Sequence, residues 1–155
     1  RRGGQISPLF YIMSIILKQL ANFANMNLDD IKIAAIKMSE KDILEIHRDQ
    51  LRMGLGGKGD IKPKYRKAYL NYKQSLPSYF AGNKVDLYVT GDFQNSTKLY
   101  YAGNEVEITA SDKKTSDLVE KYTDDIFELN KTSKEIVHDS TTPNYYKLVH
   151  EQLNK

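Results

Sequence analysis

The sequence predicts an α+β fold: helices packed on a small antiparallel sheet of about three strands, a long basic loop, and C-terminal helices. Apolar residues recur with a period near 3.6 over residues 28–53 and again from residue 116, whereas residues 85–109 alternate with a period near two. A length of 155 residues fits one domain of ordinary size. We therefore expect a single α+β domain at residues 25–155, preceded by an N-terminal arm or helix at residues 1–24.

The N-terminal segment is strongly apolar and reads PLFYIMSIILKQL from residue 8 to residue 20, after two arginines. The apolar run ends at Lys18, well short of the roughly 20 residues that a membrane span requires, so we expect no membrane partner. No small-x-small cleavage pattern follows, which argues against a signal peptide. Two interpretations stay open: a helix docked on the domain, or an arm whose apolar face a neighbouring subunit covers.

Residues 28–53 are predicted to form the main helical block, because their apolar side chains fall mostly at helical spacing. Ser39 and Asp42 have the capping arrangement that satisfies free amides at a helix start, so we expect a break near Ser39 and a second helix that ends at Met53. The glycines of residues 54–59 then end this helix, since glycine enters left-handed conformations without a steric penalty.

Three strands are expected between residues 85 and 109. The first is Val85–Val89, where apolar side chains alternate with polar ones, and the other two are joined by a turn at residues 102–105. From residue 116 helical spacing returns. Pro143 is expected to interrupt it, and residues 145–153 are predicted to form a short terminal helix.

Residues 52–76 are the strongest local charge feature of the chain. They contain seven basic side chains and one acidic side chain, a local net charge of +6; because the whole chain has +3, the remainder carries −3. We expect residues 60–78 to form a long loop with one irregular helical stretch from Tyr65 to Gln74.

Basic side chains interleaved with tyrosines suit phosphate contact together with base stacking. The residues expected to contact a partner or nucleic acid are Lys62, Lys64, Tyr65, Arg66, Lys67, Tyr69, Tyr72 and Lys73. The alternative is that the loop packs on an acidic surface, such as the segment 124–128 of another copy. Opposite charges within one small chain favour head-to-tail self-association, which closes rings when the rotation allows.

No pattern in the sequence indicates catalysis, a cofactor or a metal site. The glycine run differs from a phosphate loop, because it follows a helix and because Lys58 is followed by Gly59 instead of Ser or Thr. No two of the histidines His47, His138 and His150 have metal-site spacing. The absence of cysteine excludes disulfides, thiolate ligands and cysteine nucleophiles. We expect a protein that is not an enzyme and binds neither cofactor nor metal.

Four segments carry a resemblance: Ile46–Leu51, Val85–Ser96, Ile108–Asp112 and Asp125–Leu129. Their content and order resemble small virion proteins of tailed phages that infect Bacteroidetes. More distantly, the layout is similar to virion-morphogenesis and tail-completion proteins of long-tailed phages, whose Thr-Gly-x-(Leu/Phe)-x-x-Ser core matches TGDFQNS in this chain. The resemblance covers about residues 42–153.

The resemblance implies a structural virion subunit at the neck, the head–tail connector or the tail, acting in an oligomeric ring. The implied partners are copies of itself and the portal, tail-tube or capsid proteins of the same virion, in a particle assembled in the host cytoplasm. Gly91 is expected to be a structural turn that lets Phe93 enter the core. The alternative function is a nucleic-acid-binding accessory protein that uses the basic loop of residues 58–76.

Overall fold

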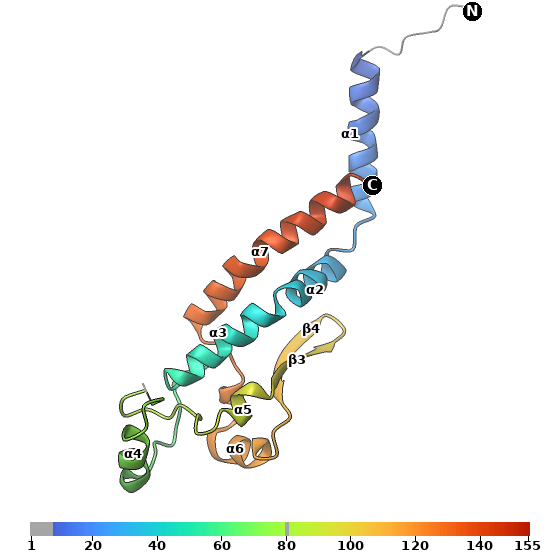
Figure 1. The fold of residues 1–155 in the computed structure, drawn as a ribbon. Coiled ribbons are helices and arrows are strands. Elements are labelled where there is room, and N and C mark those ends of the chain that lie inside the picture. The colour runs from blue at the N-terminus through green and yellow to red at the C-terminus, as the bar shows by residue number, and fades with distance from the viewer. Residues whose placement is uncertain (1–7, 80) are drawn as a thin grey trace, which may run out of the picture.

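A computed structural model describes residues 8–79 and 81–155. The helices are α1 (Pro8–Ala24), α2 (Leu28–Met38), α3 (Glu40–Arg52), α4 (Lys67–Gln74), α5 (Asp92–Asn95), α6 (Thr115–Tyr122), the 3-10 helix η1 (Asp124–Ile126) and α7 (Lys131–Leu153). The strands are β1 (Leu55–Gly56), β2 (Gly59–Asp60), β3 (Thr97–Ala102) and β4 (Glu105–Ala110). Long helices lead to a small body at one end, which contains the β3–β4 hairpin and the helices α4, α5 and α6 and which we call the α+β body (Figure 1). The predicted α+β class is confirmed.

The expected break near Ser39 is confirmed, since α2 ends at Met38 and α3 begins at Glu40. The side chain of Ser39 does not cap α3. Its hydroxyl oxygen instead accepts a hydrogen bond from Nδ2 of Asn144 in α7, at 2.8 Å. The buried serine therefore fixes the break against α7.

Helix α3 joins two hydrophobic clusters. Near its start, Ile43 and Leu44 pack with Leu99 of β3. At its other end, Leu51 is fully buried in a second cluster, whose other buried members are Ile61, Val85, Leu87, Phe93, Tyr122 and Ile126. The apolar face of α3 therefore connects the layer of long helices to the α+β body.

The β3–β4 hairpin has the expected turn at residues 102–105, and its register pairs Leu99 with Ile108. Each described sheet has two strands, and the predicted strand Val85–Val89 is wrong. Leu87 has a φ of +50°, in the left-handed region, which a strand cannot contain. Side chains satisfy this backbone instead, since the Leu87 amide donates to the Tyr65 hydroxyl and Gln94 Nε2 donates to the Asp86 carbonyl.

The predicted interruption at Pro143 is also wrong, because α7, which is 23 residues long, continues through this residue to Leu153. Proline removes the amide that would donate to the carbonyl of Asp139. Both residues are exposed, so water can hydrate the freed carbonyl. Asn130 caps the start of α7, since its side-chain oxygen accepts from the Ser133 amide at 2.9 Å.

Helix α4 falls inside the stretch that was expected to be helical, and it begins two residues later than predicted. It lies in the α+β body, whereas α1 projects from the opposite end of the molecule (Figure 1). Among the described helices, none has both the length and the apolar character required to cross a membrane.

Candidate interaction surface

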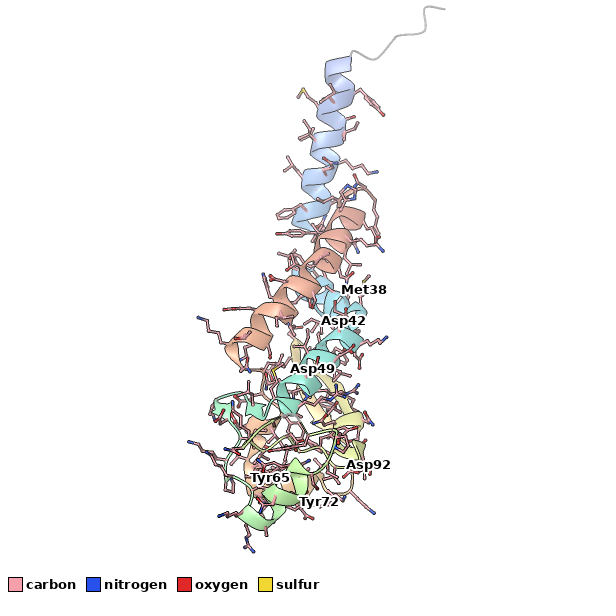
Figure 2. All side chains as sticks on the ribbon, turned by 60° about the vertical axis from the view of Figure 1, so that its left-hand side comes forward. Met38, Asp42, Asp49, Tyr65, Tyr72 and Asp92 are labelled. Carbon is pink, nitrogen blue, oxygen red and sulfur yellow. The ribbon has the colours of Figure 1, made fainter. Side chains whose placement is uncertain are left out.

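Most of the predicted contact residues lie together at the end of the molecule away from α1, where Figure 2 labels Tyr65 and Tyr72. Six of them expose their side chains and form what we call the basic surface: Lys62, Lys64, Arg66, Lys67, Tyr69 and Tyr72. Tyr69 is 38% exposed and Tyr72 is 51% exposed, so both rings are accessible to a partner. All six are therefore accessible in the structure, and their contact with a partner stays a prediction.

Tyr65 and the two exposed tyrosines form a chain of aromatic contacts. The Tyr65 and Tyr69 rings meet edge to face with centroids 4.9 Å apart, and the Tyr69 and Tyr72 centroids are 6.0 Å apart. Tyr65 is partly buried, and its hydroxyl donates to Oδ1 of Asp86 at 3.1 Å. Burial and the nearby Asp86 carboxylate raise the pKa of Tyr65, so its hydroxyl stays protonated and continues to donate. Tyr65 therefore anchors the basic surface.

Lys73 requires a correction, because it does not lie on the basic surface. Its side chain is 1% exposed, and Nζ lies 2.9 Å from Oδ1 of Asp86, which is 2% exposed. The ammonium group also donates to the carbonyl of Tyr88 and lies 5.1 Å from the centroid of the Tyr79 ring. A charge taken out of water needs such partners, so Lys73 is a structural residue and not a contact for a partner.

A cleft of about 810 Å³ opens beside the basic surface, between the loop before α4 and helices α5 and α6. Its apolar lining includes Leu87, Phe93, Leu118 and Tyr122. Its charged lining is mixed: Lys64, Arg66, Lys114 and Lys121 face the same space as Asp92, Asp112 and Asp117. Mixed charge around an apolar floor suits a protein segment better than a phosphate group. Sequence reasoning missed the α6 residues, since nothing local places α6 beside residues 63–69.

The glycine cluster packs against the turn formed by residues 123–128. The Gly57 amide donates to the Asp125 carbonyl at 3.0 Å, and the Lys58 amide donates to Oδ1 of Asp125 at 2.9 Å. A Cβ atom at Gly56 would lie 2.3 Å from Oδ2 of Asp125, and one at Gly57 would lie 2.3 Å from Cβ of Glu128. The glycines therefore permit close approach, and the backbone carbonyl and the carboxylate of Asp125 already occupy two amides that a phosphate would need.

His47 is the one fully buried histidine of the three. Its Nε2 lies 2.8 Å from the Ile126 carbonyl and donates to it in the neutral form, whereas Nδ1 has no partner in the described part of the chain. Burial lowers the pKa of His47; the hydrogen bond to Ile126 opposes this change and the Arg48 charge adds to it. Residues 8–79 and 81–155 contain no group of three or more His, Cys, Asp or Glu side chains arranged to hold a metal ion.

Gly91 lies at a sharp turn with a φ of +88°, directly before α5. A Cβ atom there would lie 3.0 Å from Cε2 of Tyr88, so both the backbone angle and the available space favour glycine. Two residues later, Phe93 enters the core and is 5% exposed.

Searches with the whole chain found no matching protein-family model, no similar curated protein and no similar solved structure.

Proposed function

We propose that this chain is a structural subunit of a tailed-phage particle, a neck, head–tail connector or tail-completion protein that acts in an oligomeric ring. The observation that carries the proposal is helix α1, whose large apolar side chains from Tyr11 to Phe23 are all at least 41% exposed. A helix that is apolar on most of its surface is stable in water only when something covers it. In an assembly, a neighbouring subunit can cover this helix.

The accessible area of the chain supports the same proposal. The chain exposes 10833 Å², whereas a compact monomer of 17.8 kDa is expected to expose about 8,000 Å². Part of this excess belongs to helix α1, whose exposed apolar side chains are the surface that a neighbouring subunit would cover in a ring.

The two ends of the molecule differ in chemistry, and this difference supports a role between unlike neighbours. The apolar helix α1 projects from one end, and the basic surface lies at the other (Figure 2). In our proposal, portal, tail-tube or capsid proteins contact the basic surface and the adjacent cleft. The resemblance of residues 42–153 to virion proteins supplies the phage context.

The experiment is a measurement of molar mass by light scattering across a range of protein concentrations, followed by electron microscopy of the largest species. We expect discrete oligomers and ring-shaped particles, and we expect the chain among the proteins of purified virions. A strictly monomeric chain at high concentration, together with its absence from virions, contradicts the proposal.

The basic surface favours a second candidate function, in which the protein is a nucleic-acid-binding accessory factor. Four exposed basic side chains beside two accessible tyrosine rings can contact phosphates and stack on bases. Affinity for single-stranded DNA should then fall steeply between about 50 and about 200 mM salt. Arg66→Ala and Lys67→Ala should weaken binding, whereas Lys98→Ala on strand β3 should not. Absence of binding at low salt eliminates this candidate.

A further inference from the structure

We infer that α1 of one copy docks in the groove between α2 and α7 of the next copy, so that chains associate head to tail. This inference rests on the proposed function as an assembly subunit and names the contact that builds the assembly. It requires an exposed apolar stripe on α1, a groove that matches it, and a reason why α1 does not cover the groove of its own chain.

The apolar stripe consists of Ile12, Ile16, Leu20 and Phe23. Steps of four, four and three residues place these side chains on one face of a helix. They are 53%, 50%, 60% and 55% exposed, respectively. The stripe therefore presents an apolar ridge of four side chains to solvent.

Two polar side chains hold the C-terminal half of α1 against the end of α7. Nδ2 of Asn22 donates to the Leu153 carbonyl at 3.1 Å, and Nε2 of Gln19 donates to Oδ1 of Asn154 at 3.3 Å. Figure 1 shows α1 pointing away from the body beyond this junction. These contacts direct the stripe away from the groove of the same chain, so another molecule must cover it.

The groove has a volume of about 440 Å³ and lies between α2 and α7. Its apolar side chains include Ala35 and Ile36 from α2 and Val137 and Tyr145 from α7. Along α7 it extends from Lys134 to Tyr146, about 18 Å at the helical rise per residue. The stripe from Ile12 to Phe23 spans about 16 Å by the same measure, so the two lengths match.

The charges on the two surfaces allow the contact. The groove is lined by the basic residues Lys32 and Lys134 and by His138. Residues 8–24 contain one charged side chain, Lys18. Lys18 follows Ile16 by two positions, about 200° around the helix, so it points to the opposite side of α1 and stays in water when the stripe is buried. The apolar ridge therefore enters the groove without bringing like charges together.

A second copy is the occupant that this geometry favours. Every chain offers both a projecting α1 and an open α2–α7 groove, so head-to-tail contact covers both in every subunit of a closed ring. One kind of partner, the chain itself, then accounts for both surfaces.

The absence of cysteine makes a direct test possible. Ile16→Cys and Thr141→Cys are made in separate chains, which are mixed and oxidised under non-denaturing conditions. Thr141 lines the middle of the groove. We expect disulfide-linked dimers between the two variants, formed several-fold faster than in a mixture of Ser14→Cys with Thr141→Cys, since Ser14 lies on the opposite side of α1.

Several outcomes overturn the inference. Equally fast linkage of Ile16→Cys to itself means that α1 pairs with α1, and an intrachain link in the chain with both cysteines means that α1 closes on its own groove. Flotation of the protein with phosphatidylglycerol vesicles, lost on Ile16→Asp, means that α1 covers itself with lipid. Oligomers that link at neither position refute only this contact, whereas a chain that stays monomeric also refutes the proposed function.

A second pair of variants tests the same contact without a cysteine or a crosslink in the groove. Ile16→Asp places a charge in the centre of the stripe, and Ser14→Asp places the same charge on the opposite side of α1. We expect Ile16→Asp to convert oligomers to monomers and Ser14→Asp to leave them intact. Both positions are exposed in the single chain, so neither substitution removes a buried contact of the folded body. Equal oligomer loss in the two variants contradicts the inference.

Discussion

Removal of the Lys73 ammonium group by Lys73→Met should destabilise the protein strongly. The ammonium group and the Asp86 carboxylate are 1% and 2% exposed and lie 2.9 Å apart. Without Lys73, the carboxylate keeps one side-chain donor, the Tyr65 hydroxyl, and loses its counterion. Breaking a buried ion pair by removing one partner costs about 3–5 kcal/mol. This loss is a large share of the ~5–15 kcal/mol that stabilises a typical domain.

The assay is urea unfolding at fixed protein concentration, followed by circular dichroism. With a slope of about 2 kcal/mol per M, the expected loss lowers the unfolding midpoint by roughly 1.5–2.5 M. Lys84→Met is the matched control, because Lys84 pairs with Asp60 at 2.8 Å but both side chains are at least 40% exposed. We expect this control to leave the midpoint nearly unchanged, because solvent screens exposed pairs.

The double variant Lys73→Met/Asp86→Asn separates a lost attraction from a stranded charge. If the stranded carboxylate is the main cost, neutralising it should restore part of the stability that Lys73→Met removes. A Lys73→Met protein that unfolds at the wild-type urea concentration refutes the assignment of Lys73 to a buried ion pair. The same conclusion follows if Lys73→Met and Lys84→Met have equal effects.

Three further predictions concern other buried or irregular positions. The lowered pKa of His47 keeps the folded imidazole neutral while the unfolded chain gains a proton below about pH 6.5, so stability should fall with decreasing pH by up to about 1.4 kcal/mol per pH unit. Urea unfolding at several pH values should show a flatter profile for His47→Gln and an unchanged one for the exposed His138→Gln. Gly57→Ala should cost about 1–3 kcal/mol in the same assay, because its Cβ atom would overlap Cβ of Glu128. Pro143→Ala should raise the thermal midpoint, since it restores an amide donor inside α7, and a lowered midpoint contradicts that account.

The sequence was informative where local pattern decides structure. The 3.6-residue period located α2 and α3, and the turn at residues 102–105 located the β3–β4 hairpin. The alternating pattern of Val85–Val89 wrongly predicted a strand. The backbone of residues 86–88 forms hydrogen bonds with the side chains of Tyr65, Lys73 and Gln94 and not with a neighbouring strand. The polar and apolar residues alternate in sequence, but Val85, Asp86 and Leu87 are all buried and the backbone turns at Leu87. Side chains distant in sequence satisfy its polar groups in place of a neighbouring strand.

Local sequence also grouped the exposed residues of the basic surface, but it did not show that Lys73 is excluded from that surface. Lys62 to Lys67 are close in sequence and stay close in space, because they lie on or beside the short, exposed connection between β2 and α4. Lys73 looks like its basic neighbours until Asp86 is known to lie against it. The burial of one lysine in a basic run depends on a contact thirteen residues away, which neither composition nor spacing encodes. The α2–α7 groove was likewise invisible, since it joins helices about 100 residues apart.

The stability of the single chain and the stability gained by assembly should respond to different substitutions in this protein. A partner that binds only the folded chain stabilises it by mass action, so the unfolding midpoint should rise with protein concentration. Ile16→Asp should abolish this dependence, because it removes the proposed contact of α1. Lys73→Met should lower the midpoint by the same amount with or without Ile16→Asp, because the Lys73–Asp86 pair is already buried in the single chain. If Ile16→Asp changes the cost of Lys73→Met, the two ends of the molecule are coupled, and α1 acts on the fold as well as on assembly.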